Sequence, residues 1–167
     1  HVKNAGLLLQ AFETLNQPNT HLLFVGNGPL ENELKSKKTW LKTASRIHFL
    51  DFQNQSAIPA IYQSCDLFCL PSKSETWGLA VNEAMACSKA ILVSDKVGCA
   101  ADLISEGKNG FTFQSENEAD LVLKLQNLCQ QKSNLQAYGQ ASAEIIKSWS
   151  FNATATAIEN AILSYAD

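Results

Sequence analysis

The sequence predicts an α/β domain in three layers, with a parallel β-sheet between two layers of helices. Two observations lead to this fold class. Apolar runs of four or five residues recur along the chain, and the run at residues 90–94 carries no charged side chain. Segments with apolar residues at helical spacing separate these runs, as in residues 3–15. Apolar strands that alternate with amphipathic helices are typical of a parallel sheet covered on both faces.

Strands are expected where an apolar run stops at a glycine, a proline or a polar cluster. This rule places strands at residues 21–25, 47–50, 67–70, 90–94 and 111–113, the last at the sheet edge. Helices follow from apolar residues at intervals of three and four. They are expected at residues 3–15, 29–38, 57–63, from about 78, and at 117–130, 133–148 and 151–166. Pro29 is expected in a first helical turn, and Ser115 and Ser150 as N-caps.

The order of these elements is unusual at the start of the chain. The sequence begins with a predicted helix, whereas a doubly wound sheet begins with a strand that is usually central. We therefore expect residues 1–167 to form a single domain whose first strand is absent, together with a partner domain on its N-terminal side. How the sheet compensates for this strand stays open, and dimerisation through the gap is one option.

The composition argues against several classes of protein. The 167 residues hold 13 Lys and Arg against 16 Asp and Glu, and this slightly acidic balance argues against nucleic acid as a partner. No apolar stretch reaches the roughly 18 residues that a membrane-spanning helix needs. The five cysteines are odd in number and lack the spacing of a zinc site. We expect free thiols and a reducing cytoplasm.

Residues 71–86 hold the strongest functional signal, a short polar loop that leads from an apolar run into a helix near Gly78. At such a point the unpaired N–H groups and the dipole of the helix favour a bound anion. Glu75 precedes the helix, and Glu83 falls in its second turn. Carboxylates accept hydrogen bonds from hydroxyls. The segment therefore suits a ligand with both phosphates and hydroxyls, such as a nucleotide sugar.

These residues resemble a known family. The pair Glu75 and Glu83, after Pro71-Ser72, matches the E-x7-E signature of the C-terminal, donor-binding domain of GT-B glycosyltransferases, in the large retaining family 4. The other matches are Lys3-Asn4, the turn at residues 23–30, the strand at 47–50, residues 83–87, residues 94–104, Asn109-Gly110 and residues 149–151. Asp51, Ser88 and Ala90 depart from the family pattern, which has glycine, glycine and proline at these places. The resemblance covers nearly the whole chain.

The resemblance implies a Rossmann-like domain, one half of a GT-B fold. It implies a retaining glycosyltransferase that moves a hexosyl group from a nucleoside diphosphate sugar to a glycan or lipid-linked acceptor, in cell-surface polysaccharide biosynthesis. It also implies that no metal or other cofactor is required, and that an absent N-terminal domain holds the acceptor. We therefore expect the isolated chain to be inactive. We expect the full enzyme in the cytoplasm, associated peripherally with the inner face of the membrane.

The family also implies roles for individual residues. Glu75 is the expected catalytic residue, which positions the donor sugar and is not assigned as a nucleophile. Glu83 is expected to bind the ribose hydroxyls, and Lys3 to neutralise the diphosphate. The backbone N–H groups of Trp77, Gly78 and Leu79 are expected to hold the same diphosphate. The remaining donor-binding candidates are Gly26, Gly28, Thr76, Trp77, Gly78 and Leu79.

Each of these roles has a structural alternative. Glu83 and Lys3 can be ordinary solvated residues, Glu75 can be an N-cap, and packing against the helix is favoured over ligand stacking for Trp77. The Gly26–Gly28 turn can serve only to join a strand to a helix. Two other functions remain open, a non-catalytic nucleotide-sugar binding or regulatory module and an epimerase of the related GT-B group. The intact pair of glutamates favours the transferase over both.

Overall fold

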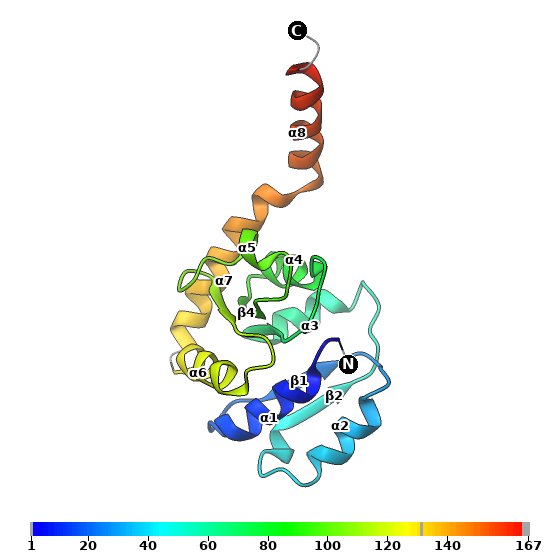
Figure 1. Ribbon diagram of the computed structural model, residues 1–167, viewed down its shortest axis with the longest axis vertical. Coiled ribbons are helices and arrows are strands. Elements are labelled where there is room, and N and C mark those ends of the chain that lie inside the picture. The colour runs from blue at the N-terminus through cyan, green and yellow to red at the C-terminus, as the bar shows by residue number, and fades with distance from the viewer. Residues whose placement is uncertain (1, 131, 165–167) are drawn as a thin grey trace.

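The structure, a computed structural model, describes residues 2–130 and 132–164 and confirms the predicted alternation of strands and helices (Figure 1). The strands are β1 (Leu22–Val25), β2 (Ile47–Leu50), β3 (Leu67–Leu70), β4 (Ala90–Ser94) and β5 (Gly110–Phe113). The helices are α1 (Ala5–Leu15), α2 (Glu31–Lys38), α3 (Ile58–Ser64), α4 (Leu79–Ala86), α5 (Ala100–Leu103), α6 (Glu118–Cys129), α7 (Lys132–Ile146) and α8 (Phe151–Ser164). Short 3₁₀ helices span Ala44–Arg46 and Lys147–Trp149. The sequence analysis did not foresee α5, and the predicted end of the last helix lies partly outside the described residues.

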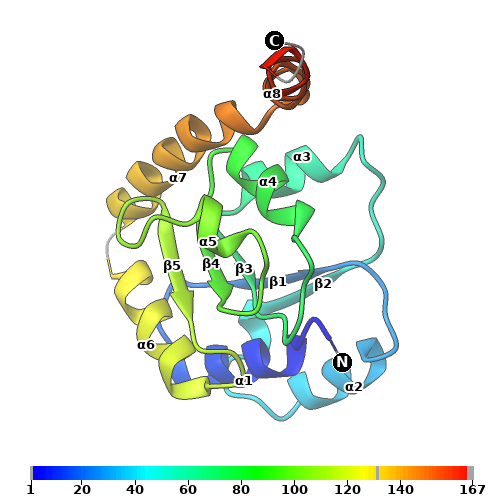
Figure 2. The same cartoon turned by 45° about the horizontal axis from the view of Figure 1, so that its top comes forward.

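All strand pairs are parallel, but they form two hydrogen-bonded sheets where the sequence analysis expected one. β1 pairs with β2, and Leu22 lies opposite Ile47. β4 lies between β3 and β5, so β5 is an edge strand as predicted. Within the described part of the chain, no ladder joins β1 to β3 (Figure 2).

β4 is the centre of the domain, and all five of its residues are buried. Its alternate side chains point to opposite faces of the sheet, as the pleat requires. Ala90 and Leu92 pack into one apolar cluster with α1 and α6, whereas Ile91 and Val93 pack into a second cluster with α4. These two clusters form the interfaces of a three-layer α/β/α fold, which confirms the predicted fold class.

A third apolar cluster covers one face of the β1–β2 pair. Leu9 and Phe12 of α1 and Leu34 of α2 meet Ile47 of β2 there. Each of these side chains is at most 7% exposed, and burial of such a side chain stabilises the fold by roughly 1.5–3 kcal/mol. α1 therefore packs against both sheets, because its other buried residues Leu8 and Ala11 belong to the cluster around β4.

The last two helices, α7 and α8, differ in how they pack. α7 packs along the three-stranded sheet, with Leu135 in the first cluster and Ile145 and Ile146 against the second. α8 then extends away from the body of the domain (Figure 1) and has no buried residue. Phe151, at its start, is 97% exposed. No helix within residues 2–130 and 132–164 is long and apolar enough to cross a membrane.

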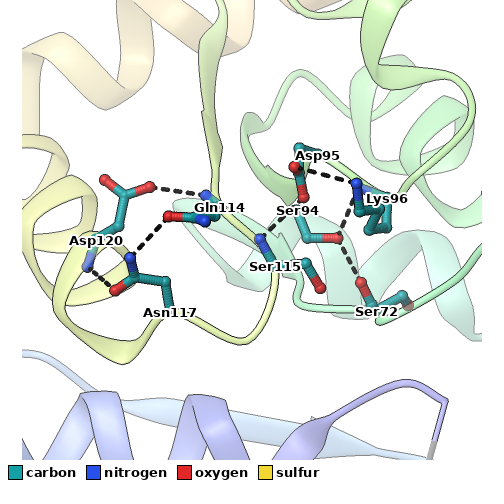
Figure 3. Close-up of polar contacts among 8 residues, drawn as sticks. All are labelled: Ser72, Ser94, Asp95, Lys96, Gln114, Ser115, Asn117 and Asp120. Atoms are coloured by element: carbon teal, nitrogen blue, oxygen red, sulfur yellow. Dashed lines mark hydrogen bonds and ion pairs between the residues drawn. The ribbon is translucent and has the colours of Figure 1, made fainter.

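The structure corrects two of the three predictions about helix N-termini. Asn117 caps α6, because its side chain accepts a hydrogen bond of 3.1 Å from the N–H of Asp120 (Figure 3). Ser115 is therefore not the N-cap. Pro29 precedes α2 and its N-cap Leu30, so it does not lie in the first turn. Ser150 is confirmed, since its hydroxyl oxygen accepts from the N–H of Ala153 at 3.2 Å.

Candidate donor-binding site

The structure places a helix start beyond the carboxyl end of β3, as the sequence predicts. α4 begins at Leu79 after its N-cap Gly78, whose φ of 99° lies in the left-handed region that favours glycine. A Cβ at position 78 would also approach Cγ1 of Val97 to 3.0 Å. No side chain caps this helix. The N–H of Val81 donates to the carbonyl of Gly78 at 2.8 Å, so the N–H groups before Val81 are the ones that can face an anionic ligand.

The loop before α4 is held by the loop after β4, residues 95–99. The N–H of Glu75 donates to the carbonyl of Lys96 at 3.0 Å, and the N–H of Gly98 donates to the carbonyl of Glu75 at 2.9 Å. A Cβ on Gly98 would lie 1.9 Å from the carbonyl oxygen of Thr76, so only glycine fits there. The sequence analysis noted Gly98 only as part of a motif and missed this supporting role.

Two of the candidate residues meet at this loop. Nζ of Lys3 forms an ion pair with Oε2 of Glu75, and the two side chains are 64% and 20% exposed. The carbonyl of Val2 accepts a hydrogen bond of 2.8 Å from the N–H of Lys73, which ties the start of the described chain to the loop after β3. The suggestion that Glu75 caps α4 is wrong, since α4 has no side-chain cap.

Glu83 lies in the second turn of α4, on the side that faces α3. The hydroxyl of Tyr62 donates a hydrogen bond of 3.1 Å to Oε2 of Glu83. Burial, and then the charge of Glu83, raise the pKa of Tyr62 well above its usual value of 10.0. The phenol therefore stays neutral at ordinary pH and holds the carboxylate in place as a hydrogen-bond donor.

Beside Glu83 lies a groove of about 500 Å³ between α3 and α4. Its wall is largely apolar, and the ring of Phe52 at its border is 75% exposed. The lining residues are Phe52, Gln53, Gln55, Ile58, Pro59, Tyr62, Glu83, Ala86 and Cys87. Apart from Glu83, the sequence analysis named none of these residues as part of a site. The aromatic and apolar residues on either side of the predicted helix at 57–63 were the available signal.

Trp77 is packed, as the sequence analysis favoured. Its Nε1 donates a hydrogen bond of 3.0 Å to Oδ1 of Asn82. Its ring lies 5.3 Å from that of Trp149, centroid to centroid, and the two planes are inclined at 39°. Trp149 belongs to the segment that leads into α8. The loop before α4 is thus in contact with the base of the projecting helix.

The remaining candidates, Gly26 and Gly28, lie in the turn after β1. Gly26 has a φ of 106°, and its N–H donates to the carbonyl of Leu50 at 2.9 Å. No atom lies within 4 Å of a Cβ built on either glycine. Open space above the backbone fits both a close ligand and a simple turn, so their predicted role in donor binding stays a prediction.

A polar network joins the loops at the carboxyl ends of β3, β4 and β5 (Figure 3). Oγ of Ser94 donates to the carbonyl of Ser72, and the N–H of Lys96 donates to Oγ of Ser94 at 3.3 Å. The N–H of Ser115 donates to Oδ1 of Asp95 at 2.9 Å. These bonds fix the segment that leads to Glu75 against its neighbours.

Two histidines contact each other at the β1–β2 pair. The rings of His21 and His48 stack beside the β1–β2 pair, with Nδ1 and Nε2 3.0 Å apart. Among the described residues, no group of three or more His, Cys, Asp or Glu could hold a metal ion.

Comparison with known proteins decides the family. Residues 1–145 match the family model described as glycosyl transferases group 1. The chain belongs to this family. It is 31% identical over 161 residues to the sulfoquinovosyl transferase SQD2 of Arabidopsis thaliana, covering 95% of this chain and 30% of that protein. It is 35% identical over 112 residues to the N,N'-diacetylbacillosaminyl-diphospho-undecaprenol alpha-1,3-N-acetylgalactosaminyltransferase of Campylobacter jejuni. This match covers 67% of this chain and 28% of that protein.

Solved structures of glycosyl transferases share the fold of this domain. The C-terminal domain of LpcC from Francisella tularensis superposes with a TM-score of 0.79 at 21% identity, covering 88% of this chain and 79% of that one. HepE of Anabaena, solved with UDP and glucose, superposes with a TM-score of 0.81 at 23% identity. This match covers 98% of this chain and 45% of that chain. The group 1 domain thus has the Rossmann-like fold of one GT-B half. It spans about 30% of the curated relatives described above.

Proposed function

We propose that this group 1 domain is the donor-binding half of a retaining glycosyltransferase. The observation that carries the proposal is the uncapped start of α4 at the carboxyl edge of the sheet, with Glu75 paired to Lys3 beside it and Glu83 in its second turn. Ligands of parallel α/β sheets bind beyond this edge. The arrangement offers donors to phosphates and acceptors to sugar hydroxyls in one continuous stretch of chain.

The diphosphate of the donor would lie against the N–H groups of Trp77, Gly78 and Leu79. Negative charge grows on this group as the bond to the sugar breaks, and preorganised donors stabilise that charge. Lys3 would add a positive charge at the same place. Its partner Glu75 lies in the loop directly before α4. The ion pair therefore holds the Lys3 side chain next to the start of α4 before any ligand binds.

The nucleoside would lie on the other side of the helix start. Glu83, oriented by Tyr62, would accept hydrogen bonds from both ribose hydroxyls. The apolar groove next to it has room for a base, with Phe52 and Pro59 available for contact with a flat ring. HepE, which shares the fold, has been solved with UDP, and this supports a nucleoside diphosphate as the ligand class.

The hexosyl group would then lie near Glu75. In this role Glu75 binds sugar hydroxyls and orients the anomeric carbon towards the acceptor, and no metal or other cofactor is assigned. The acceptor would be held by an N-terminal domain, so that this chain alone binds donor weakly and transfers nothing. The name of the Campylobacter relative contains a diphospho-undecaprenol acceptor. A lipid-linked or other cell-surface glycan is accordingly the acceptor class that we propose, for an enzyme at the inner face of the membrane.

Calorimetry on the complete polypeptide tests the proposal. UDP and GDP, alone and linked to glucose, galactose, mannose or N-acetylglucosamine, are titrated into the wild type and into Glu83→Gln. We expect one base to bind and the variant to lose at least tenfold in affinity, since the carboxylate accepts two hydroxyl bonds. Glu144→Gln is the matched control, because Glu144 is 71% exposed in α7 and forms an ion pair with Lys147 on the same part of the chain. Equal affinities in all three proteins would refute the assignment of Glu83.

A non-catalytic nucleotide-sugar binding module is the second candidate. This hypothesis predicts the same nucleotide affinities as the transferase hypothesis. The two differ only in whether the protein turns over the donor. Release of nucleoside diphosphate from the bound donor by the complete polypeptide, with and without added lipid-linked glycans, separates the two. A protein that binds donor at the site but never releases diphosphate would support the module.

A further inference from the structure

Asn27, in the turn after β1, ties that turn to the groove beside Glu83. Its Oδ1 accepts a hydrogen bond of 2.5 Å from the N–H of Phe52, a groove residue 25 positions further along the chain. A second bond joins the same two segments, since the N–H of Gly26 donates to the carbonyl of Leu50 at 2.9 Å. The turn and the start of the loop after β2 are therefore held together at two neighbouring points.

The charges around Asn27 fix the direction in which its amide points. Its Nδ2 donates to Oε2 of Glu31 at 3.3 Å, and Oε1 of Glu31 accepts from Nζ of Lys35 at 2.6 Å. The bond from Lys35 lowers the pKa of Glu31 below its usual value of 4.5, so this carboxylate is ionised at ordinary pH. A reversed amide would turn its oxygen towards the carboxylate and its NH₂ group towards the N–H of Phe52. Because both contacts are repulsive, Oδ1 faces Phe52.

The side chain of Phe52 contributes little to holding this part of the groove in place. Its ring is 75% exposed, so packing does not fix its position. The far end of the same loop is closed by Asn54, whose Oδ1 accepts from the N–H of Ala57 at 3.0 Å, directly before α3. Phe52 and Gln53, which line the groove, thus lie between an anchor at Asn27 and an anchor at Asn54.

We propose that Asn27 is a positioning residue for nucleotide binding. Its amide holds the backbone of Phe52 so that the ring stands at the border of the groove, preorganised for contact with a flat base. Asn27 acts through Phe52 and not by its own contact with the base. This inference rests on the proposed function, because it takes the groove as the place of the base.

Calorimetry with UDP and GDP on the complete polypeptide tests this role. Asn27→Leu keeps the size of the side chain and removes both of its hydrogen bonds. We expect the affinity for the bound nucleotide to fall about two- to tenfold, the range of one ordinary hydrogen bond. The midpoint of urea unfolding should not change, because Asn27 is exposed. Asn32→Leu is the matched control, since Asn32 is exposed in α2 and should leave the affinity unchanged.

Two further variants separate positioning from a general structural effect. Asn27→Asp combined with Glu31→Gln keeps the acceptor for the N–H of Phe52 and exchanges donor and acceptor in the second bond. The affinity should return to within about twofold of wild type. Phe52→Ala removes the ring through which Asn27 acts, so adding Asn27→Leu to it should have almost no further effect.

The outcomes distinguish this inference from the proposed function. An unchanged affinity in Asn27→Leu, with a clear loss in Glu83→Gln, would overturn the positioning role alone. The same holds for a loss that the paired substitution does not restore, or one that is equally large without the ring of Phe52. If neither UDP nor GDP binds the wild type, the proposed function fails, and the role of Asn27 fails with it.

Discussion

The hydroxyl of Tyr62 donates a hydrogen bond of 3.1 Å to Oε2 of Glu83, and this bond joins α3 to α4 at the border of the apolar groove. Tyr62 also meets Phe68 of β3 edge-on, with 5.7 Å between ring centroids. The phenol is therefore anchored at its ring and directs its hydroxyl towards the carboxylate. Glu83 is thus oriented without a ligand.

Removal of this hydroxyl tests whether orientation matters. Tyr62→Phe keeps the ring contacts and frees the carboxylate, so we expect nucleotide affinity to fall about two- to tenfold, which corresponds to about 0.5–1.4 kcal/mol, the net contribution of one ordinary hydrogen bond. Calorimetry measures the affinity, and the unfolding midpoint checks the fold. Tyr138→Phe is the control, since Tyr138 packs against Phe111 away from the groove. An unchanged affinity in Tyr62→Phe would contradict the positioning role.

The second prediction concerns the ion pair of Lys3 and Glu75. In the complete enzyme, Glu75→Gln is expected to lower kcat by about a hundredfold or more, because we propose that this residue contacts the transferred sugar. The affinity for the free nucleotide should change less than threefold. Initial rates and calorimetry give the two values. Glu116→Gln, which alters the exposed pair with Lys73, should leave both unchanged. A loss of nucleotide affinity as large as the loss of kcat would argue against a role at the sugar.

The third prediction concerns Gly98 and its contact with Thr76. In Gly98→Ala the added methyl group would lie 1.9 Å from the carbonyl oxygen of Thr76 and must displace the loop that carries Glu75. Overpacking of this kind costs about 1–3 kcal/mol, and urea unfolding measures it. Gly28→Ala is the matched control, because its Cβ would meet open space. We expect its stability to stay within about 0.5 kcal/mol of wild type. Equal stabilities for the two variants would show that the loops are not tightly apposed.

The fourth prediction concerns the pair Trp77 and Trp149. Trp149→Ala removes a ring that supports the loop before α4, and aromatic pairs in contact contribute about 0.5–1.5 kcal/mol. We expect donor affinity to fall about two- to tenfold, with the fluorescence of Trp77 shifted. Trp40→Ala serves as the comparison, since Trp40 is 87% exposed and should affect neither signal beyond its own emission. An effect of equal size in both variants would exclude a specific link between Trp149 and the site.

The fifth prediction concerns pH and Cys69. Burial raises the pKa of the Cys69 thiol from 9.0 to about 12. The unfolded chain loses this proton near pH 9, while the folded chain keeps it. Stability is therefore complete below pH 9 and falls as the pH rises towards 12, by at most about 1.4 kcal/mol per pH unit. Urea unfolding at pH 8 to 10.5 should show a shallower decline in Cys69→Val. An identical decline would mean that Cys69 ionises freely in the fold.

Local sequence patterns were sufficient to predict most of the helices and strands. They were not sufficient to predict how the strands assemble into sheets. The strand at residues 47–50 and the strand at 67–70 have the predicted bounds, because a short and mainly apolar run between polar residues or a proline leaves few alternatives. The N-cap of α6 was misassigned because both Ser115 and Asn117 are good capping residues. Only the path of the chain shows which of them reaches the N–H of Asp120.

The candidate site also has features that the sequence determines and features that only the tertiary structure decides. The sequence by itself determined the family pattern, the polar loop before α4 and the places of Glu75 and Glu83 along the chain, because these depend on neighbours within a few residues. The tertiary structure alone decided that Lys3 pairs with Glu75 and that Tyr62 orients Glu83. It also decided that β1 and β3 are left without a common ladder. These relationships join residues 21 or more positions apart, and only the packing of α1, α3 and α4 on the strands brings them into contact.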